Sequence, residues 1–526
     1  MLFVVLFVCA TSLVNVAVAK EAAGVADSEM PAIAPAESSA GNTGSGNTAD
    51  IAGYKLNISG YLREHVSFNL QNPPETKQND TWDLSMARTT LQAEASLEKN
   101  GIRFQGIGRV VGEMNTDYLK RLDALPGQTG NLMDQYNVSE LRELYAEFSP
   151  IDRVQLRLGK QQIVWGETDF FQAMDIVQGF DYTWRSFLEG ENEDYRKPLI
   201  LANAMIQVPE VRGSLQVYLR PALDRNKDIG NTYDLFGGRW ANQPNKGVNF
   251  YNLPDGTPLV PYNFHHQKGD VDDVTYGARW QATAGPVNYS LAYLKIFGPN
   301  PVVNSATHPY ESTSTAGILG EFIYPKYDVF GVTASAAVDS VDAVFSTEVT
   351  YTKDQFFNVG TQVAADVPIP GWGGIVKKNT VRFMLRMDKQ LALMNLLGTS
   401  QASFFSVQFF DTWIQSFNKS DDIVDLAGYG APKKEHNGLL TAILGLNYMN
   451  GRVNPQLAGG YDTTYGGGFL IPSLSLAFGD KWRFNTEADL FFAKASKGVN
   501  QVENSTHLLG YFANNNQLMM RLTRQF

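Results

Sequence analysis

YKLNISGYLREHVSFNLQ, residues 54–71, alternates between apolar and polar side chains along its whole length. Its even-numbered positions are apolar or small apart from Glu64, whereas its odd-numbered positions are polar or amphipathic. An α-helix would mix the two sets, but a β-strand directs successive side chains to opposite faces. The stretch therefore predicts a strand with one apolar face and one wet face.

The same alternation returns many times further along the chain. One example is the pair of segments on either side of Asn450-Gly451, a dipeptide that is typical of tight β-hairpins. The alternating segments predict strands at 54–71, 82–98, 101–113, 139–149, 153–165, 199–208, 212–220, 273–284, 286–297, 327–338, 341–352, 376–388, 402–415, 438–449, 452–461, 466–478, 481–493 and 516–526.

The connections between these strands alternate between short and long, except that 389–401 is long where a short turn is due. The long connections are 114–138, 166–198, 221–272, 298–326, 353–375 and 416–437. A β-sandwich or a propeller has no reason to lengthen every second loop. The predicted fold class is therefore all-β: a transmembrane antiparallel β-barrel of about 16–18 strands with short periplasmic turns and long extracellular loops.

The last residues, NQLMMRLTRQF, form an alternating segment that ends on an aromatic residue. The outer-membrane assembly machinery captures such an ending by strand pairing, so we expect Leu522 and Phe526 to act as the C-terminal assembly signal. The predicted location is the outer membrane of a Gram-negative bacterium, with outer-membrane lipid around the barrel.

The first residues predict a chain that is exported. Residues 1–19 are an apolar run that ends in Ala17-Val18-Ala19, a signal-peptidase site with cleavage after Ala19. Residues 20–51 are rich in Ala, Ser, Gly, Pro and Thr, and they can bury too little apolar surface to become ordered. We therefore predict a signal peptide at 1–19, a disordered periplasmic leader at 20–51 and the barrel at 52–526.

Composition argues against several kinds of partner and of chemistry. The formal charge of −11 and the pI near 5.2 argue against nucleic acid, whose binding needs clustered Lys and Arg. The single cysteine, Cys9, lies in the first apolar run, so the rest of the chain holds no disulfide, thiolate metal site or cysteine nucleophile. The six histidines stand in no known catalytic motif. We expect no enzyme activity, no catalytic residues, no metal and no cofactor.

Polar residues on the wet faces of the strands should line the lumen. Alternation alone requires polar residues there. Rows of arginine would in addition steer acidic or amphipathic solutes, because a narrow charged lumen focuses the electrostatic potential. The residues that we expect to line the channel are Arg157, Lys160, Gln162, Arg382, Arg386, Asp388 and Gln408.

The segment RLGKQQIVWGETD, residues 157–169, does not fit an unbroken alternation of lumen-facing and lipid-facing side chains. Unbroken alternation would place Lys160 and Gln162 in the bilayer, where a lysine costs about 2–4 kcal/mol at the midplane. A bulge near Gly159 would turn both residues inward, because glycine most readily adopts the backbone angles of a bulge. It would also send Ile163 and Trp165 outward to the upper aromatic girdle.

The loops 166–198 and 221–272 contain many Phe, Tyr and Trp residues, which are costly to leave in solvent. We expect at least one of these loops to fold into the barrel mouth as a binding or constriction element, with an external lid as the alternative. The gate residues that we expect are Glu167, Asp169, Asp181 and Arg185.

Several motifs follow one another in a specific order. They are RLGKQQIVWGETDFF, EGENEDYRKPL, RFMLRMDKQ, SFFSVQFFDTWI and VNPQLAGGYDTTYGGGFLIPSLSLAF. In this order, over most of residues 54–526, the chain resembles a family of Gram-negative outer-membrane β-barrels catalogued as domain of unknown function 1302. That family typically has arginine in place of Lys160, and Asn-Pro before the residue that matches Asp181.

The resemblance implies a large outer-membrane barrel. In some genomes such a barrel is encoded beside a resistance-nodulation-division-type transporter of the inner membrane and a lipoprotein-like periplasmic protein. That context implies traffic of lipids or other hydrophobic molecules, with a periplasmic lipid carrier and the transporter as partners.

The leading functional hypothesis is a channel that passes small hydrophobic or amphipathic molecules, lipids among them, by diffusion. The close alternative is a general porin for polar solutes. From a different class, the barrel could be an outer-membrane enzyme or a surface-binding scaffold.

Overall fold

The computed structural model describes residues 47–51, 53–72, 76, 78–125, 132–166, 171, 173–183, 192–233, 239, 253, 257–265, 270–312, 317–361, 367, 370–425, 431–493, 509, 512–513 and 515–526. All of them belong to one compact unit, residues 41–526. Ala17 and Ala19 lie outside the described residues, so the signal peptide stays a prediction. No helix within the described ranges has the length and apolarity that would let it cross a membrane.

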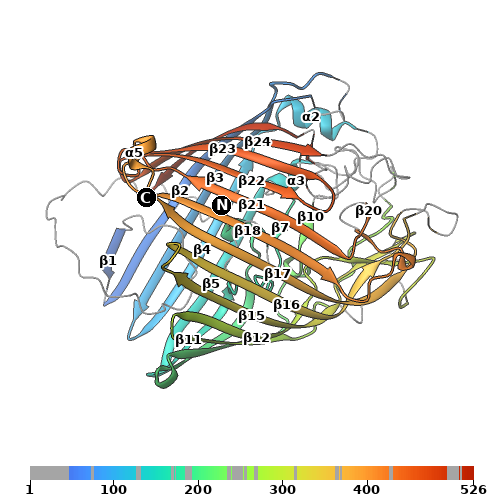
Figure 1. Cartoon of the computed structure of the whole chain (residues 1–526), viewed down its shortest axis with the longest axis horizontal. Coiled ribbons are helices and arrows are strands. Elements are labelled where there is room, and N and C mark those ends of the chain that lie inside the picture. Colours follow the sequence, from blue (N-terminus) through green and yellow to red (C-terminus); the bar gives the residue numbers. More distant parts are fainter. Residues whose placement is uncertain are drawn as a thin grey trace. The chain divides into compact units, whose positions relative to one another are not determined.

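The described strands form a closed antiparallel barrel, and they run at a slant around its wall (Figure 1). The sheet has 19 strands, of which β1 (Asn47–Ile51) only adds to the edge of β2, so that 18 close the ring. The barrel strands are β2 (Tyr54–Asn69), β3 (Leu84–Lys99), β4 (Ile102–Glu113), β5 (Val138–Ile151), β6 (Val154–Gln161), β8 (Leu199–Val208), β9 (Gly213–Arg220), β11 (Thr275–Ala284), β12 (Val287–Phe297), β15 (Lys326–Val338), β16 (Ala343–Asn358), β17 (Ile375–Leu391), β18 (Ser403–Ile414), β21 (His436–Gly445), β22 (Val453–Asp462), β23 (Gly467–Phe478), β24 (Trp482–Ala493) and β25 (Gln517–Gln525). The predicted fold class is confirmed.

Each predicted strand corresponds to one barrel strand, and only the ends differ. β6 ends at Gln161 rather than at residue 165, because the chain there leaves the wall and turns into the barrel. β16 extends to Asn358, past an irregularity between Thr352 and Gln355 at which Asp354 has a φ of +51°.

The seam between the first and the last barrel strand closes at the C-terminal residue. Gly60 and Phe526 exchange backbone hydrogen bonds of 3.1 and 3.0 Å. A Cβ on Gly60 would lie 2.8 Å from Cζ of Phe526, so glycine lets the terminal ring pack on β2. Beyond this point β2 has no partner in β25, and β1 pairs with its residues 54–58 instead. The last part of the predicted leader, Asn47–Ile51, is thus a strand.

The two ends of the barrel differ in their connections. At one end, which we call the turn end, the connections are 100–101, 152–153, 209–212, 285–286, 339–342, 392–402, 446–452 and 479–481. The irregular one, 392–402, contains α5 (Met394–Leu397), which Gly398 closes in a left-handed conformation with a φ of +69°. At the other end, the loop end, all connections but 463–466 are long.

Short helices and short strands lie within these connections. At the turn end η1 (Pro209–Val211) joins β8 to β9. At the loop end lie α2 (Asp117–Asp123), α3 (Met133–Tyr136), β7 (Asp181–Tyr182), α4 (Asn192–Tyr195), η2 (Asn226–Asp228), β10 (Thr232–Tyr233), β13 (Val302–Ser305), β14 (Gly320–Ile323), η3 (Lys419–Asp421), β19 (Val424–Asp425) and β20 (Ala431–Pro432).

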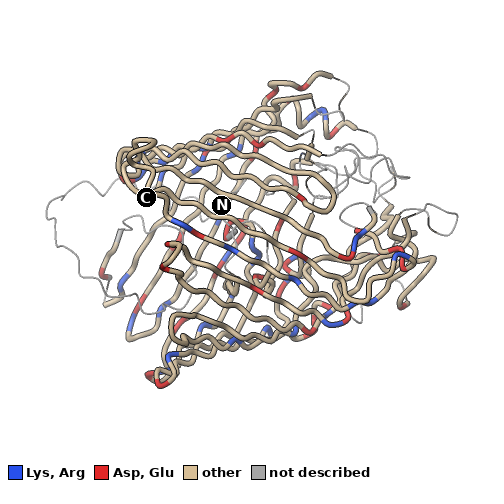
Figure 2. Tube along the Cα trace, viewed as in Figure 1, with Lys and Arg blue, Asp and Glu red and all other residues tan. Residues whose placement is uncertain are grey.

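The alternation separates the two faces of the wall. Outward positions such as Leu291 and Phe330 are about half exposed, with exposed fractions of 51% and 50%, whereas inward positions such as Arg88 and Glu348 are buried. Glu64, the exception in the opening stretch, does lie on the outward face, where its carboxylate accepts a hydrogen bond of 2.9 Å from the Thr89 hydroxyl. Charged residues of both signs occur on the strands and in the connections (Figure 2).

Candidate functional site

The loop between β6 and β8 folds into the barrel, and we call its described residues, from 162 to 198, the inserted segment. Its Met174 amide donates a 2.8 Å hydrogen bond to the Glu348 carboxylate of β16. Gly331 of β15 makes room for this contact, because a Cβ there would overlap the sulfur of Met174. The expectation that a long aromatic loop enters the barrel is confirmed.

One side of the inserted segment packs on the barrel wall through apolar groups. Ile163 and Trp165 are 3% and 1% exposed and belong to a core cluster with inward residues of β8, β9, β12 and β15. The Trp165 indole donates to Oε1 of Gln216 at 2.8 Å and contacts the Tyr218 ring edge-on, with 5.4 Å between ring centroids. The prediction that these two side chains reach the outer aromatic girdle is wrong, because the chain has already left the wall at Gln161.

Arginines of the wall hold α4, at the other side of the inserted segment. Asp194 Oδ2 lies 3.4 Å from Nη1 of Arg63 on β2, and Asp194 Oδ1 lies 3.2 Å from Nη1 of Arg109 on β4. Arg142 on β5 donates to the backbone carbonyls of Glu193 and Arg196. Three strands on one side of the wall, β2, β4 and β5, therefore fasten one short helix through charge-assisted hydrogen bonds, which are roughly twice as strong as neutral ones.

A second polar network joins the first part of the inserted segment, residues 162–175, to its last part, residues 192–198. Arg196 forms an ion pair with Asp175, and its Nη1 also donates to Oε1 of Gln162 at 3.0 Å. The Gln162 amide in turn donates to Oε1 of Glu143 at 2.9 Å. All four side chains are buried. The inserted segment is thus tied both to itself and to β5.

An aromatic cluster lies where the inserted segment meets the loop that follows β9. β7 and β10 pair in parallel there, with Tyr182 opposite Tyr233. The rings of Tyr182 and Tyr233 stack at 5.5 Å, and Phe180 and Tyr195 lie 6.0 and 5.9 Å from Tyr182. We call these four residues the aromatic cluster. Asp181 of β7 accepts hydrogen bonds from the hydroxyls of Thr183 and of Thr232 in β10, at 2.6 and 3.2 Å. The second of these bonds helps to hold β7 beside β10.

The aromatic cluster reaches the opposite wall. Tyr182 and Tyr233 are close enough to the partly buried Arg382 of β17 for an electrostatic interaction, and Ala173 of the inserted segment packs with Met384 of the same strand. Counted from β2 around the ring of 18, β4 is the third strand and β17 the twelfth, so they face each other across the barrel. Because α4 is bound to Arg109 of β4, the inserted segment bridges the lumen from wall to wall.

The lumen between this bridge and the turn end is lined by charged pairs that are in part exposed. Arg157 and Glu147 are 2.6 Å apart, and their side chains are 21% and 13% exposed. Arg386 and Asp388 are 2.8 Å apart, with exposures of 14% and 25%. Arg157, Arg386 and Asp388 lie at the inward positions where we expected them. Gln408 also points inward and is buried.

The family model described as "Protein of unknown function (DUF1302)" matches residues 9–526, which is nearly the whole chain. The chain belongs to this family. The family resemblance that the ordered motifs indicate is thereby confirmed, and no curated protein is detectably similar in sequence to this DUF1302 member.

Solved outer-membrane barrels resemble this DUF1302 protein remotely. OmpF of Salmonella typhi, in complex with daunomycin, is 10% identical with a TM-score of 0.41, and the match covers 91% of this chain and 100% of that one. OccAB1 of Acinetobacter baumannii is 8% identical with a TM-score of 0.44, over 92% and 98% of the two chains. OccK11 of Pseudomonas aeruginosa is 8% identical with a TM-score of 0.42, over 90% and 96%. Identity this low carries no information about function.

Lys160 of this DUF1302 protein departs from the prediction. β6 pairs without interruption through Gly159, and Lys160 lies opposite the outward residues Leu144 and Ile200. The bulge lies instead in the partner strand β5, where Arg142 is the extra residue in the pairing with β4. The Lys160 side chain therefore starts from the outward face and extends to a loop-end residue, with Nζ 3.7 Å from Asp228. It does not line the lumen.

Gly159 nevertheless has an unusual backbone, with a φ of +133°. A Cβ at this position would overlap the carbonyl oxygen of Leu144. Glycine is thus required by the close approach of β5, rather than by a bulge in β6. Of the predicted gate residues, Glu167, Asp169 and Arg185 lie outside the described residues, and their role stays a prediction.

Sequence reasoning missed two residues of the interior in this DUF1302 member. Asp194 anchors the inserted segment, and Arg239, in the loop after β9, is fully buried and lies 2.7 Å from Oε1 of Glu113. Both belong to loops that give no periodic signal, and their partners lie on distant strands.

Lys197 ties the inserted segment to the loop that follows β9. Its Nζ donates to the carbonyls of Lys227 and Ile229, at 3.0 and 3.3 Å. Burial lowers the pKa of Lys197 to about 8, although the negative charges of Asp181 and Asp228 act in the opposite direction. The strength of this tie therefore depends on pH in the mildly alkaline range.

Proposed function

We propose that this protein is a channel of the Gram-negative outer membrane that passes small hydrophobic or amphipathic molecules, lipids among them, by diffusion. A closed barrel satisfies its backbone groups without water, as a bilayer requires. The observation that carries the substrate class is the aromatic cluster beside Arg382. Aromatic faces hold the apolar body of a molecule, and a guanidinium holds its carboxylate or phosphate.

Block of single-channel current by dodecanoate tests this proposal. In planar bilayers we expect a small wild-type conductance that dodecanoate blocks and that a neutral sugar does not. Arg382→Gln should weaken the block about tenfold or more, which corresponds to the loss of about 1.4 kcal/mol. Arg386→Gln is the matched control, because it removes another inward arginine of β17 that pairs with Asp388 outside the aromatic cluster.

A general porin for polar solutes is the second candidate, and the partly exposed pairs of Arg157 with Glu147 and Arg386 with Asp388 favour it. The bridge across the lumen argues against a wide aqueous pore. A large, open and weakly selective conductance that dodecanoate leaves unchanged would favour the porin and overturn the hydrophobic substrate class. Block that is equally strong in Arg382→Gln would overturn the assigned binding residue.

Enzymatic and scaffold functions have weaker support. His436 pairs with Asp411 at 2.7 Å, but a hydrolase also needs a nucleophile that reaches the imidazole. Among the described residues, no hydroxyl group forms a hydrogen bond with the His436 ring. A scaffold would need a lumen filled along its whole length, whereas the charged pairs near the turn end keep exposed surface.

The partners are proposed on the family resemblance alone. We propose that the turn end faces the periplasm and receives a lipid carrier, which an inner-membrane transporter of the resistance-nodulation-division type supplies. Photo-crosslinking from α5 in intact cells would identify such a carrier. Crosslinks from α5 only to lipid would contradict it.

A further inference from the structure

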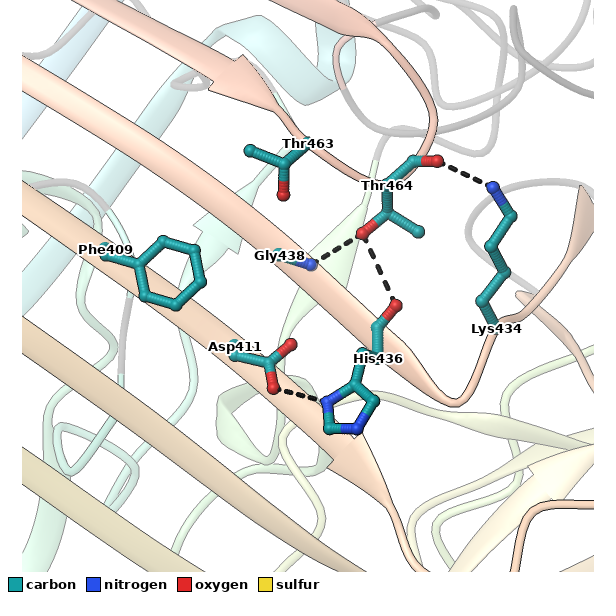
Figure 3. A pocket seen from close by; sticks show the side chains of 7 residues that line it. All are labelled: Phe409, Asp411, Lys434, His436, Gly438, Thr463 and Thr464. Carbon is teal, nitrogen blue, oxygen red and sulfur yellow. Dashed lines mark hydrogen bonds and ion pairs between the residues drawn. The ribbon is translucent and has the colours of Figure 1, made fainter.

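A hollow of about 470 Å³ opens on the outer face of the barrel, at the loop end of β18 and β21. It is lined by Phe409, Asp411, Lys434, His436, Gly438, Thr463 and Thr464 (Figure 3). Phe409 and Trp413 are both 37% exposed, and they alternate along β18 with the buried inward residues Phe410 and Ile414. The hollow therefore faces away from the lumen.

The floor and the rim of the hollow come from three segments. Gly438 forms the floor, because a Cβ there would overlap the Thr463 hydroxyl. The Gly438 amide donates to the Thr464 hydroxyl at 2.6 Å, which holds the connection between β22 and β23 against β21. The hollow is thus built where the connection 463–466 packs against the start of β21.

Two basic side chains, Lys434 and His436, lie at the rim, and each has a nitrogen that can face a ligand. Lys434 Nζ donates to the Thr464 carbonyl at 2.7 Å (Figure 3), and it lies 4.9 Å from the Tyr465 ring centroid. An ammonium has three N–H groups, so this bond leaves two. His436 uses Nδ1 for Asp411 at 2.7 Å and stacks on Trp413, so its orientation is set while Nε2 remains available.

We propose that this hollow binds the phosphate of a lipid in the leaflet at the loop end. Lys434 would donate to the phosphate oxygens, and so would the Nε2–H of His436 in its doubly protonated form, since phosphate accepts strong charge-assisted hydrogen bonds. Phe409 pairs with Leu440 on the same outward face, and both continue from the hollow toward the apolar belt. An occupant with a phosphate beside the cations and an alkyl chain on Phe409 and Leu440 is a lipid rather than a free anion.

Native mass spectrometry of the full barrel, titrated with dioleoyl phosphatidic acid or dioleoyl phosphatidylcholine, tests the assignment. We expect the wild type to retain phosphatidic acid at least several-fold more than phosphatidylcholine. Lys434→Gln/His436→Gln should lose this preference, whereas Lys99→Gln/His265→Gln, which removes the same residue types elsewhere, should keep it. Gel migration before and after heating shows whether each barrel has folded. If the Lys434→Gln/His436→Gln barrel does not fold, the single Lys434→Gln variant is measured in its place.

Three outcomes would overturn the proposal. The first is equal retention of the two lipids by the wild type. The second is an unchanged preference in the Lys434/His436 variant. The third is full competition by inorganic phosphate at a concentration similar to that of the lipid, because the alkyl chain would then contribute nothing. None of these outcomes depends on which solute crosses the lumen.

Discussion

Asp194→Asn should release the inserted segment from the wall. The Asp194 carboxylate contacts Arg63 at 3.4 Å and Arg109 at 3.2 Å, and all three side chains are at most 14% exposed. A hydrogen bond to a charged group contributes about 1.5–3 kcal/mol. Asparagine keeps one acceptor oxygen but loses the charge, so we expect a loss of roughly 3 kcal/mol over both contacts. That loss shifts the ratio of released to docked segment by about a hundredfold.

Single-channel recordings in planar bilayers measure this shift. The wild type should remain at a low conductance. In Asp194→Asn, the ratio of time at a larger conductance to time at the low conductance should rise about a hundredfold. Asp388→Asn is the matched control, because it also removes a lumen carboxylate paired with an arginine, yet its partner Arg386 lies on β17 and not in the inserted segment. Equal occupancy of the larger conductance in the two variants would refute the anchoring role of Asp194.

Three further predictions concern stability and assembly. Gly331→Leu should destabilise the barrel by about 1–3 kcal/mol through overlap with the inserted segment, whereas Gly112→Leu, whose Cβ meets nothing, should not; thermal unfolding in detergent compares them. The pKa of Lys197 is about 8 in the folded protein, below the unfolded value of about 10.4. Between these two pH values the unfolded chain holds the proton and the folded chain does not, so the free energy of unfolding should rise as pH rises from about 8 to about 10.4. This gain in stability is lost again as pH falls to about 8. Denaturant unfolding across this range should show the rise in the wild type, and an equal rise in Lys197→Met would contradict it. Deleting Phe526 removes the backbone closure on Gly60 and should lower the folded fraction in the membrane several-fold, as gel migration before and after heating reports; an unchanged fraction would show that the terminal residue is dispensable.

The barrel itself was predictable because each strand carries its own evidence. In residues 54–69 the choice between wall faces is made residue by residue, since a side chain that meets lipid must differ from one that meets water. The same local rule located the inward residues Arg157, Arg382, Arg386 and Asp388 correctly. Closure followed from the number of strands and from the need to leave no unpaired edge.

Only the tertiary structure decided what fills the barrel. The outward register of Lys160 depends on continuous pairing with both neighbouring strands, and the burial of Trp165 depends on where the chain leaves the wall. Asp194 and Arg109 lie 85 positions apart, yet together with Arg382 on the facing wall they determine how the lumen is bridged. Alternation describes a side chain's own strand, so it contains no information about a loop whose binding energy comes from strands on both sides of the barrel. The sequence by itself therefore determined the wall, and contacts between distant segments decided the passage.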